Sequence, residues 1–384
     1  MTNITALLMS IITTLSLFFG TLGSSDYARQ TGLAEAIKAS VKRGEITASS
    51  FVGEVDDYKW SPDKEYSLDD TVVLKKERGK DFVILNLADV HFSDYDYRAW
   101  YAFDGTATIK RLVATVKPDL ITVSGDIVCG KSSRYAIARF TDLMESFGIP
   151  WAPIFGNHDK EANCDINYLA DVMMKSPHCV MQKGDPAMGV GNYIINICED
   201  DGSGELIPVE SLIMYYCRTP DAGTLKAWYA WAADGINKIS GGKAETFVMA
   251  HIPLPEYIEA YDKAWNAEKN CWNDGYKAYG ELHEKICIDY DADGKPVLEG
   301  FFDELKAHGT KYFFCSHDHM NDFSLEYEGI RLTYMMKLGF GSGFQPGFNG
   351  GTVIRIGDNG INRITHKTLS IGILKDIVDI DTLK

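Results

Sequence analysis

The sequence predicts an α/β fold built on buried parallel strands. Two observations carry this prediction: five short apolar runs have the length and continuous hydrophobicity of strands buried on both faces, and helical segments separate the first three of them. The five runs are 82–87, 120–124, 151–155, 247–249 and 312–315. With 384 residues, of which 45% are hydrophobic and 24% charged, the chain is long enough to bury one sizeable core.

The segments between and after these runs complete the predicted layout. Helices are expected at 106–117 and 135–147, where they would form right-handed crossovers between parallel strands, and at 224–239, where Trp228 and Trp231 would form a core stripe. After His319, four apolar runs separated by glycine-bearing turns are expected to be antiparallel strands. These runs are 323–327, 330–334, 352–356 and 361–365.

The N-terminal part of the chain defines the predicted domain boundaries. The apolar run 6–23 suits the core of a signal peptide, but no Lys or Arg precedes it. An anchor of reversed orientation and a plain amphipathic helix are the alternatives. We therefore expect a signal peptide or N-terminal anchor at 1–23, with export of the protein, then an extension at 24–80 that packs on a sheet edge, and the main domain at 81–384.

Each of the five apolar runs ends in residues that commonly bind metals. In an open α/β sheet, ligands gather at the carboxyl ends of the strands, so these polar residues are expected to lie close together. Their oxygen and imidazole donors suit Mn, Fe and Zn. The sequence therefore predicts one shared metal site. Its candidate residues are Asp89, His91, Asp126, Asn157, His158, Asp159, His251, His317 and His319.

The order of these blocks resembles that of the calcineurin-like metallophosphoesterases, whose signature runs D-x-H, G-D, G-N-H-D/E, H and G-H-x-H. The segments 251–257, 300–302 and 317–322 resemble the branch usually labelled purple-acid-phosphatase-like. The resemblance covers about 81–356. It implies a four-layer α-β-β-α sandwich of two mixed sheets, in which the four runs after His319 would belong to the second sheet.

Two departures from the family pattern bear on the chemistry. Purple acid phosphatases carry a tyrosine ligand where this chain has Cys129, and their first motif lacks the histidine that His91 supplies. The resemblance therefore does not imply an Fe(III)-tyrosine centre. Ser316 replaces the glycine of G-H-x-H, a change small enough for both histidines of the motif to reach the metals.

Carried over residue by residue, the resemblance implies two transition-metal ions, Mn, Fe or Zn, bridged by Asp126. One ion would be held by Asp89, His91, Asp126 and His319, and the other by Asp126, Asn157, His251 and His317. Such a pair can clamp a phosphate and supply a bridging hydroxide as nucleophile. His158 would contact the phosphate and protonate the leaving oxygen, with Asp159 orienting it.

These residues indicate a metal-dependent phosphoric ester hydrolase, and specifically a phosphomonoesterase. A phosphodiesterase is the near alternative, and a phosphoesterase fold kept as a non-catalytic binding scaffold is the alternative from a different class. The expected substrate is a small-molecule or protein-borne phosphoester. The net charge of −16 argues against a broad nucleic-acid interface, and no stable membrane association is expected unless residues 1–23 form an N-terminal anchor.

Two other motifs compete for parts of the same sequence. Residues 125–132 satisfy the Walker A pattern of P-loop nucleotide-binding proteins, but Asp126 would point a negative charge at a cradle built for phosphates. Residues 289–294 resemble the opening of an EF-hand, but the position that needs a glutamate is Gly300. A solvated turn is therefore expected at 289–294. The eight cysteines have no C-x-x-C spacing and indicate neither a zinc knuckle nor a small disulfide framework.

Overall fold

The computed structural model describes residues 59–92, 105–130, 133–161, 164–339, 343, 347–370 and 373–382. The predicted signal peptide or anchor and most of the predicted extension lie outside these ranges. No helix among the described residues is long and apolar enough to cross a bilayer.

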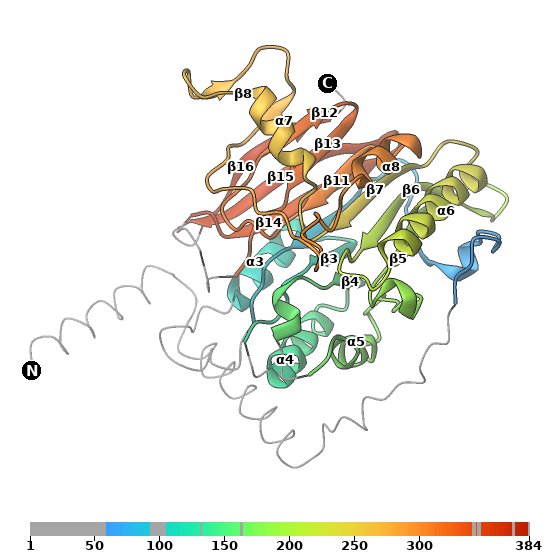
Figure 1. Ribbon diagram of the computed structural model, residues 1–384. Coiled ribbons are helices and arrows are strands. Elements are labelled where there is room, and N and C mark those ends of the chain that lie inside the picture. The colour runs from blue at the N-terminus through green and yellow to red at the C-terminus, as the bar shows by residue number, and fades with distance from the viewer. Residues whose placement is uncertain are drawn as a thin grey trace, which may run out of the picture.

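Two mixed sheets form the centre of the molecule (Figure 1). The six-stranded sheet has the order β16 (Ile373–Asp381), β15 (Gly360–Ser370), β14 (Gly350–Gly357), β2 (Phe82–Leu87), β3 (Leu120–Ser124) and β4 (Trp151–Ile154). The strands β2, β3 and β4 run parallel to one another, as predicted. All the side chains of β2 and β3 are buried, which explains their uninterrupted apolar sequences.

The eight-stranded sheet contains the other two predicted parallel strands. Its order is β1 (Val72–Lys75), β5 (Tyr193–Asp200), β6 (Leu206–Tyr215), β7 (Glu245–Ala250), β11 (Tyr312–Cys315), β13 (Ile330–Tyr334), β12 (Ser324–Tyr327) and β10 (Ala278–Tyr279). The strands β7 and β11 are parallel neighbours at its centre. A separate short hairpin pairs β8 (Trp265–Asn266) with β9 (Cys271–Trp272).

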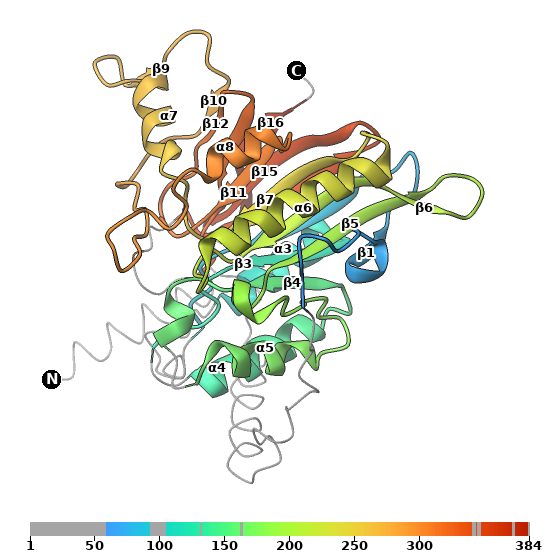
Figure 2. The ribbon, with the colours of Figure 1, turned by 45° about the vertical axis from the view of Figure 1, so that its right-hand side comes forward.

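Helices cover the outer face of each sheet, so that the molecule has four layers (Figures 1 and 2). The helices α3 (Thr106–Val116), α4 (Ser133–Glu145) and α5 (Ile166–Met174) share a core with the six-stranded sheet. The helices α6 (Ala222–Ser240), α7 (Glu256–Ala264) and α8 (Phe301–Ala307) share a core with the eight-stranded sheet. Short 3₁₀ turns lie at η2 (Leu68–Asp70), η3 (His158–Glu161) and η4 (Pro186–Met188).

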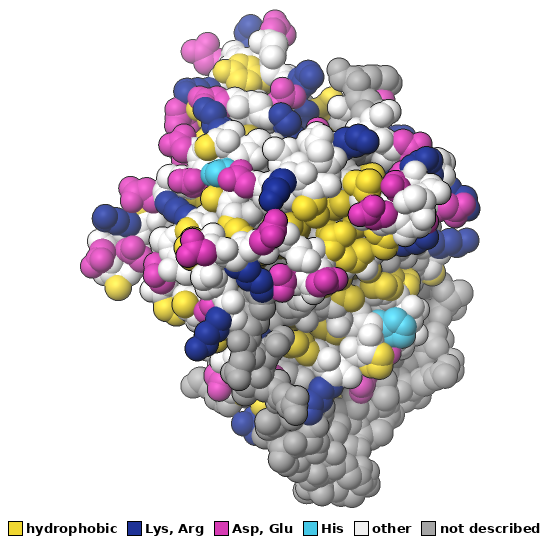
Figure 3. Space-filling view, turned by 90° about the vertical axis from the view of Figure 1, so that its right-hand side faces the viewer, with side chains coloured by type: hydrophobic (Ala, Val, Ile, Leu, Met, Phe, Trp, Pro, Cys, Tyr) yellow, Lys and Arg dark blue, Asp and Glu magenta, His cyan; other side chains and the backbone are white. Residues whose placement is uncertain are grey.

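Alternation along the strands of the eight-stranded sheet separates its two faces. Leu212 and Phe247 lie in the core that the two sheets share, whereas Ile213 and Val248, one residue further along each strand, lie in the core under α6. Both faces of this sheet are therefore buried. On the surface view in Figure 3, acidic and basic side chains are interspersed around apolar areas.

The assignment of the last four strands to one sheet is wrong for two of them. As predicted, β12 pairs antiparallel with β13 and β14 pairs antiparallel with β15. However, β14 also pairs antiparallel with β2, with Val353 opposite Leu85, and thereby joins the six-stranded sheet. Only β12 and β13 belong to the sheet of β7 and β11. Nothing local in an alternating apolar run specifies its distant partner strand, so the sequence could not distinguish the two sheets.

The residues that lead into the main domain take part in the fold from Trp60 onward. The edge strand β1 pairs parallel with β5, and the Tyr66 ring packs so closely on α6 that a Cβ at Gly235 would lie 2.3 Å from its Cγ. The Tyr66 hydroxyl accepts a hydrogen bond from Asn196 Nδ2 at 2.9 Å. These contacts place the end of the predicted extension at the edge of the eight-stranded sheet.

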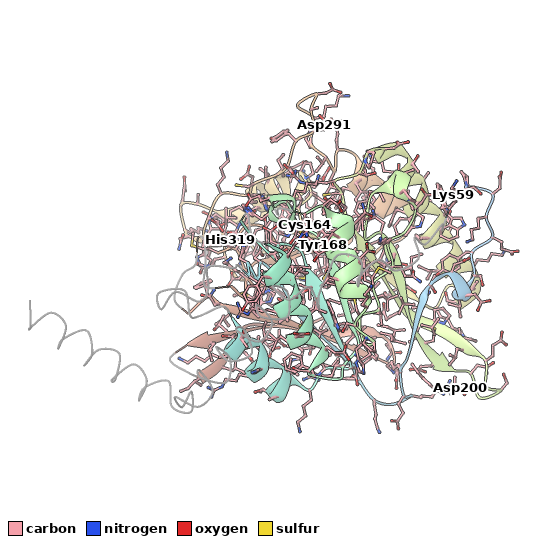
Figure 4. All side chains as sticks on the ribbon, turned by 90° about the horizontal axis from the view of Figure 1, so that it is seen from below. Lys59, Cys164, Tyr168, Asp200, Asp291 and His319 are labelled. Carbon is pink, nitrogen blue, oxygen red and sulfur yellow. The ribbon has the colours of Figure 1, made fainter. Side chains whose placement is uncertain are left out.

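The Walker A pattern and the EF-hand-like segment can both be compared with the structure. Asp126 lies among histidines rather than beside a phosphate cradle, and residues 131–132 of the Walker A pattern lie outside the described ranges. In the EF-hand-like segment, Asp291 Oδ1 accepts hydrogen bonds from the amides of Asp293 and Lys295, both at 2.9 Å. Figure 4 shows Asp291 on a projecting turn at the edge of the molecule.

Candidate metal centre

The candidate ligands emerge where strands of both sheets end. Asp89 follows β2, Asp126 follows β3 and Asn157 follows β4 in the six-stranded sheet. His251 follows β7 and His317 follows β11 in the eight-stranded sheet. Because both sheets deliver their carboxyl ends to the same place, residues from five strands meet between them.

Two overlapping groups of side chains result. In the first group, one potential ligand atom from each of Asp89, His91, Asp126 and His319 lies within 4.8 Å of the others. In the second group, the same holds for Asp126, His251 and His317. Asp126 belongs to both groups, as a bridging ligand would. Asn157 extends the second group, because its Oδ1 lies 3.0 Å from His251 Nε2.

The buried polar atoms of this cluster are suited to binding a cation. Both carboxylate oxygens of Asp89 and the Oδ2 of Asp126 are buried without a hydrogen-bond partner among the described residues. The Nε2 atoms of His91 and His319 face each other at 3.3 Å. Buried carboxylate oxygens without partners are costly unless they bind a cation, and carboxylate and imidazole donors together suit a transition metal.

Unusual backbone geometry supports the cluster. The φ angles of Asp89, His91, Asp126 and His317 are 47°, 52°, 50° and 75°, in the left-handed region that residues with a Cβ seldom adopt. Such strain commonly accompanies functional sites. The glycine of G-N-H is required for a different reason, because a Cβ at Gly156 would lie 2.2 Å from Asp126 Oδ1.

A second set of contacts fixes the orientation of His251. Its Nδ1 lies 2.9 Å from the Ser124 carbonyl oxygen and 3.1 Å from Ser316 Oγ. Donation from Nδ1 to the carbonyl leaves Nε2 as the atom that faces Asp126 Oδ2 at 3.4 Å. Ser316 itself donates to the Ser124 carbonyl at 2.8 Å. Ser316, which replaces the glycine of the motif, therefore helps to position the His251 ring together with the Ser124 carbonyl.

Charge interactions within the cluster are strong. Burial disfavours charge on both Asp126 and His251, but their attraction prevails, so the pKa of Asp126 lies well below its usual value and the pKa of His251 rises to about 9. Burial and the neighbouring His251 lower the pKa of His317 to about 3. A bound cation would replace the proton on His251 as the partner of Asp126.

His158 lies beside the cluster on η3. Its backbone amide donates to Asp126 Oδ1 at 2.8 Å, and its ring centroid is 5.2 Å from that of His91. Its Nδ1 lies 2.7 Å from Glu161 Oε1. Asp159 instead accepts hydrogen bonds from the amides of Val128 and Gly156, so the contact that orients His158 comes from Glu161 rather than from the predicted Asp159. Burial and nearby Asp126 raise the pKa of Asp159 to about 7.

A single family model covers the part of the chain that contains all the candidate ligands. Residues 82–321 match the model of the family described as calcineurin-like phosphoesterase. The chain belongs to the calcineurin-like phosphoesterase family. The resemblance read from the D-x-H, G-D, G-N-H-D, H and H-x-H blocks is thus confirmed.

Curated relatives include proteins named as purple acid phosphatases and one named only as a phosphatase. The chain is 26% identical over 304 residues to the "Probable inactive purple acid phosphatase 14" of Arabidopsis thaliana, which covers 67% of this chain and 71% of the relative. It is 27% identical over 280 residues to "Phosphatase DCR2" of Saccharomyces cerevisiae, which covers 65% of this chain and 46% of the relative.

Solved structures show weaker similarity. A dimetal phosphatase from Danio rerio aligns with a TM-score of 0.46 and 11% identity, over 77% of this chain and 98% of the other. A purple acid phosphatase from yellow lupin aligns with a TM-score of 0.43 and 8% identity, over 79% of this chain and 54% of the other.

Two features of this family member were missed by motif reasoning. Lys337 is 2% exposed, and its Nζ donates to the Asp89 carbonyl at 3.2 Å, so an ammonium group lies directly behind a candidate ligand. Burial lowers the pKa of Lys337 to about 8. Asp318 accepts a hydrogen bond from the Tyr334 hydroxyl at 2.5 Å and from the Cys287 amide, which anchors the loop of His317 and His319. A lysine inside the apolar run 335–338 was the available sequence signal.

Cys129 occupies the position of the purple acid phosphatase tyrosine. Its Sγ lies 3.5 Å from the His91 carbonyl oxygen, which it can reach as a weak donor. Cys129 follows β3 of the six-stranded sheet, whereas His319, which Figure 4 labels, follows β11 of the eight-stranded sheet. Within the family, this chain therefore combines a histidine at position 91 with a thiol where the branch has a phenol.

Proposed function

We propose that the protein is a metal-dependent phosphoric ester hydrolase that acts on phosphomonoesters. The observation that carries this proposal is the pair of ligand groups that share Asp126, together with the unpartnered buried carboxylate oxygens of Asp89 and Asp126. Membership of the calcineurin-like phosphoesterase family supports the same chemistry. The proposed substrate is a small-molecule or protein-borne phosphoester rather than a nucleic acid, because the chain carries a net charge of −16.

In this proposal the two ligand groups hold two ions. Asp89, His91, Asp126 and His319 would hold one, and Asp126, Asn157, His251 and His317 would hold the other. When bound, a pair of Mn, Fe or Zn ions would supply a clamp for the phosphate and a water of lowered pKa as the nucleophile. The protein's own contribution is to fix the donors through strained backbone, through the Ser124 carbonyl and through Lys337.

His158 is the proposed proton donor to the leaving oxygen. It lies next to Asn157, and its Nδ1 contact with Glu161 directs the other ring nitrogen away from that carboxylate. A histidine so held can deliver a proton to an alkoxide as the phosphorus–oxygen bond breaks. Glu161 is a positioning residue in this scheme, while Asp159 joins the segments that follow β3 and β4 by accepting from the Val128 and Gly156 amides.

Two alternatives differ from this proposal in substrate or in chemistry. A phosphodiesterase would use the same centre with a larger ester. A non-catalytic scaffold is favoured by the name of the Arabidopsis relative, which describes that protein as probably inactive. Against a scaffold, this chain retains all seven candidate ligands and His158.

The test is hydrolysis of p-nitrophenyl phosphate and of its bis ester by chelator-stripped protein, before and after addition of Mn, Zn or Fe ions one at a time. We expect turnover to return with metal, to favour the monoester, and to fall by at least about a hundredfold in Asp126→Asn. The bound metal per chain, measured by elemental analysis, should drop in the same variant. Asp303→Asn, an exposed carboxylate on α8, serves as the matched control.

Three outcomes would contradict the proposal. Equal turnover in Asp126→Asn and wild type would exclude the two-metal mechanism. Preference for the bis ester would favour the phosphodiesterase. Metal binding without turnover of either ester would favour the scaffold.

A further inference from the structure

Three hydrogen-bond donors beside His158 have no acceptor among the described residues. Lys160 lies two positions after His158 on η3, and no described carboxylate lies within 4.0 Å of its Nζ. The Nε of Arg218 and the hydroxyl of Tyr216 are both buried without a hydrogen-bond partner. Burial of unpartnered donors is costly, so the Arg218 Nε and the Tyr216 hydroxyl call for an acceptor, and the exposed Lys160 adds an ammonium group that can reach the same acceptor.

The three donors lie close to one another. Lys160 Nζ is 5.8 Å from the centroid of the Tyr216 ring. Arg218 forms an ion pair with Asp289, and both the Arg218 guanidinium and the Asp289 carboxylate act electrostatically on Lys160 and on Tyr216. Burial and the Arg218 charge lower the pKa of Lys160. Two cations therefore share the Asp289 carboxylate, and the Asp159 carboxylate, whose own pKa is raised to about 7, also acts on Tyr216. Lys160 and Arg218 thus leave this group of residues with an excess positive charge where Asp159 is protonated.

This group of donors borders the candidate metal centre. The Tyr216 ring packs against Phe155, with 6.2 Å between the ring centroids, and Phe155 directly precedes the Gly156-Asn157-His158 turn. On the other side, the Asp289 carboxylate acts on the His317 ring. The donors therefore lie on the His158 and His317 side of the centre, next to the residue that we propose protonates the leaving oxygen.

We propose that Lys160, Arg218 and Tyr216 form a subsite for an anionic substituent on the leaving group of the ester. The inference rests on the proposed function and adds a substrate class to it: phosphomonoesters whose alcohol carries a carboxylate or a second phosphate. Charge-assisted hydrogen bonds from an ammonium and a guanidinium suit either group of anionic oxygens. In a chain with a net charge of −16, a local excess of positive charge beside the centre would also select against esters of uncharged alcohols.

Matched esters provide the test. O-phosphoserine and O-phosphoethanolamine differ by one carboxylate, and propanediol bisphosphate and propanediol monophosphate differ by one phosphate. With metal-loaded wild-type protein, we expect kcat/KM to favour the member with the additional anionic group, O-phosphoserine or propanediol bisphosphate, in at least one pair by about tenfold or more. The pair that shows the preference identifies the anion as a carboxylate or a phosphate.

Variants connect that preference to the subsite. Lys160→Met should reduce the ratio of kcat/KM within the preferred pair by about tenfold, and Tyr216→Phe, which keeps the ring against Phe155, should reduce it by roughly threefold. Lys243→Met is the matched control, because this exposed lysine precedes β7 and so lies at the opposite end of that strand from His251. The control should leave both the ratio and the activity unchanged.

The outcomes separate this inference from the proposed function. If p-nitrophenyl phosphate is hydrolysed but both members of each pair react alike, the subsite is excluded while the proposed function stands. An unchanged ratio in Lys160→Met would also exclude it. If no ester is hydrolysed, the proposed function fails, and calorimetry of O-phosphoserine and O-phosphoethanolamine binding to the metal-loaded protein decides the subsite: equal affinities overturn it, and a preference lost in Lys160→Met supports it.

Discussion

At the scale of single residues, the candidate centre depends on close approaches that only small or strained residues allow. Asp126 illustrates this dependence. Its φ is 50°, its Oδ1 accepts a hydrogen bond from the His158 amide, and its Oδ2 has no hydrogen-bond partner among the described residues and so is available to bind a metal ion. A Cβ at Gly156 would meet Oδ1, and a Cβ at Gly125 would lie 2.5 Å from His251 Nδ1. The glycines of G-D and G-N-H are therefore needed to bring the carboxylate and the imidazole together.

The role of His158 gives a prediction at this scale. In His158→Gln the backbone amide that supports Asp126 remains, but the side chain can no longer deliver a proton. We expect kcat for O-phosphoethanolamine to fall by about 10²–10⁴-fold, because an alkoxide leaves poorly without protonation. Hydrolysis of p-nitrophenyl phosphate should suffer much less, since p-nitrophenolate is a stable anion. Steady-state kinetics with the two esters measures the difference.

Glu161→Gln provides the matched comparison for this prediction. The amide can still contact His158 Nδ1, so the variant should keep most of the activity and show a weaker version of the same leaving-group dependence. Equal losses for the two esters in His158→Gln would mean that the residue binds the phosphate without protonating the leaving oxygen.

Motifs predicted the candidate ligands but not their supporting contacts. The ligand types and their order along the chain are local features, so Asp89, Asp126 and His251 could be found without a structure. The partner of His158 could not, because Asp159 and Glu161 are both near in sequence and only the 3₁₀ turn decides which one faces the ring. Lys337 is 248 positions from Asp89, and a contact at that separation has no local signal.

At the scale of elements, strand pairing places charged groups between the sheets. Glu210 on β6 lies opposite Glu245 on β7, and the tight turn before β15 brings Gly360 so close that a Cβ there would lie 2.9 Å from both carboxylates. Glu210 is fully buried, and neither of its oxygens has a hydrogen-bond partner among the described residues. Periodicity predicted the strands, but it could not show that β14 and β15 would cover an acidic pair on the other sheet.

Glu210 gives a prediction about pH. Burial, with a contribution from Glu245, raises the pKa of Glu210 well above its ordinary value of 4.5. Between the two values the folded state binds more protons than the unfolded state, so stability must fall as pH rises from about 5 through the raised pKa. Glu210→Gln removes this dependence, and by pH 8 the variant should be more stable than wild type by on the order of 1–3 kcal/mol.

Urea unfolding at several pH values between about 5 and 8 measures this effect. Glu268→Gln, an exposed residue in the β8–β9 turn, should follow the wild-type pH profile. Lys311 and Tyr312 also act on the acidic pair, from the start of β11. A Glu210→Gln profile parallel to that of wild type would mean that these neighbours already compensate the buried charge.

At the scale of the whole molecule, the candidate centre joins the two sheets. Asp89, Asp126 and Asn157 come from the six-stranded sheet, while His251 and His317 come from the eight-stranded sheet. The apolar core between the sheets is non-directional, whereas shared ions would fix their relative positions. The family fold was predictable because each ligand block is a short contiguous motif that follows one strand. The position of one sheet against the other was not, because it depends on tertiary contacts that no single motif contains.

Metal binding should therefore stabilise both sheets together. At an ion concentration about 100 times Kd, the free energy of unfolding should rise by about 2.7 kcal/mol, and Tm by roughly 3 °C, relative to chelator-treated protein. Asp126→Asn should lose most of this shift because its carboxylate belongs to both ligand groups, whereas His178→Gln, whose ring contacts Glu145 instead, should retain it. Hydrogen exchange should slow in β2 and β3 and equally in β7 and β11. Protection confined to one sheet would mean that the ion contacts only half of the ligands and that Asp126 is not a bridge.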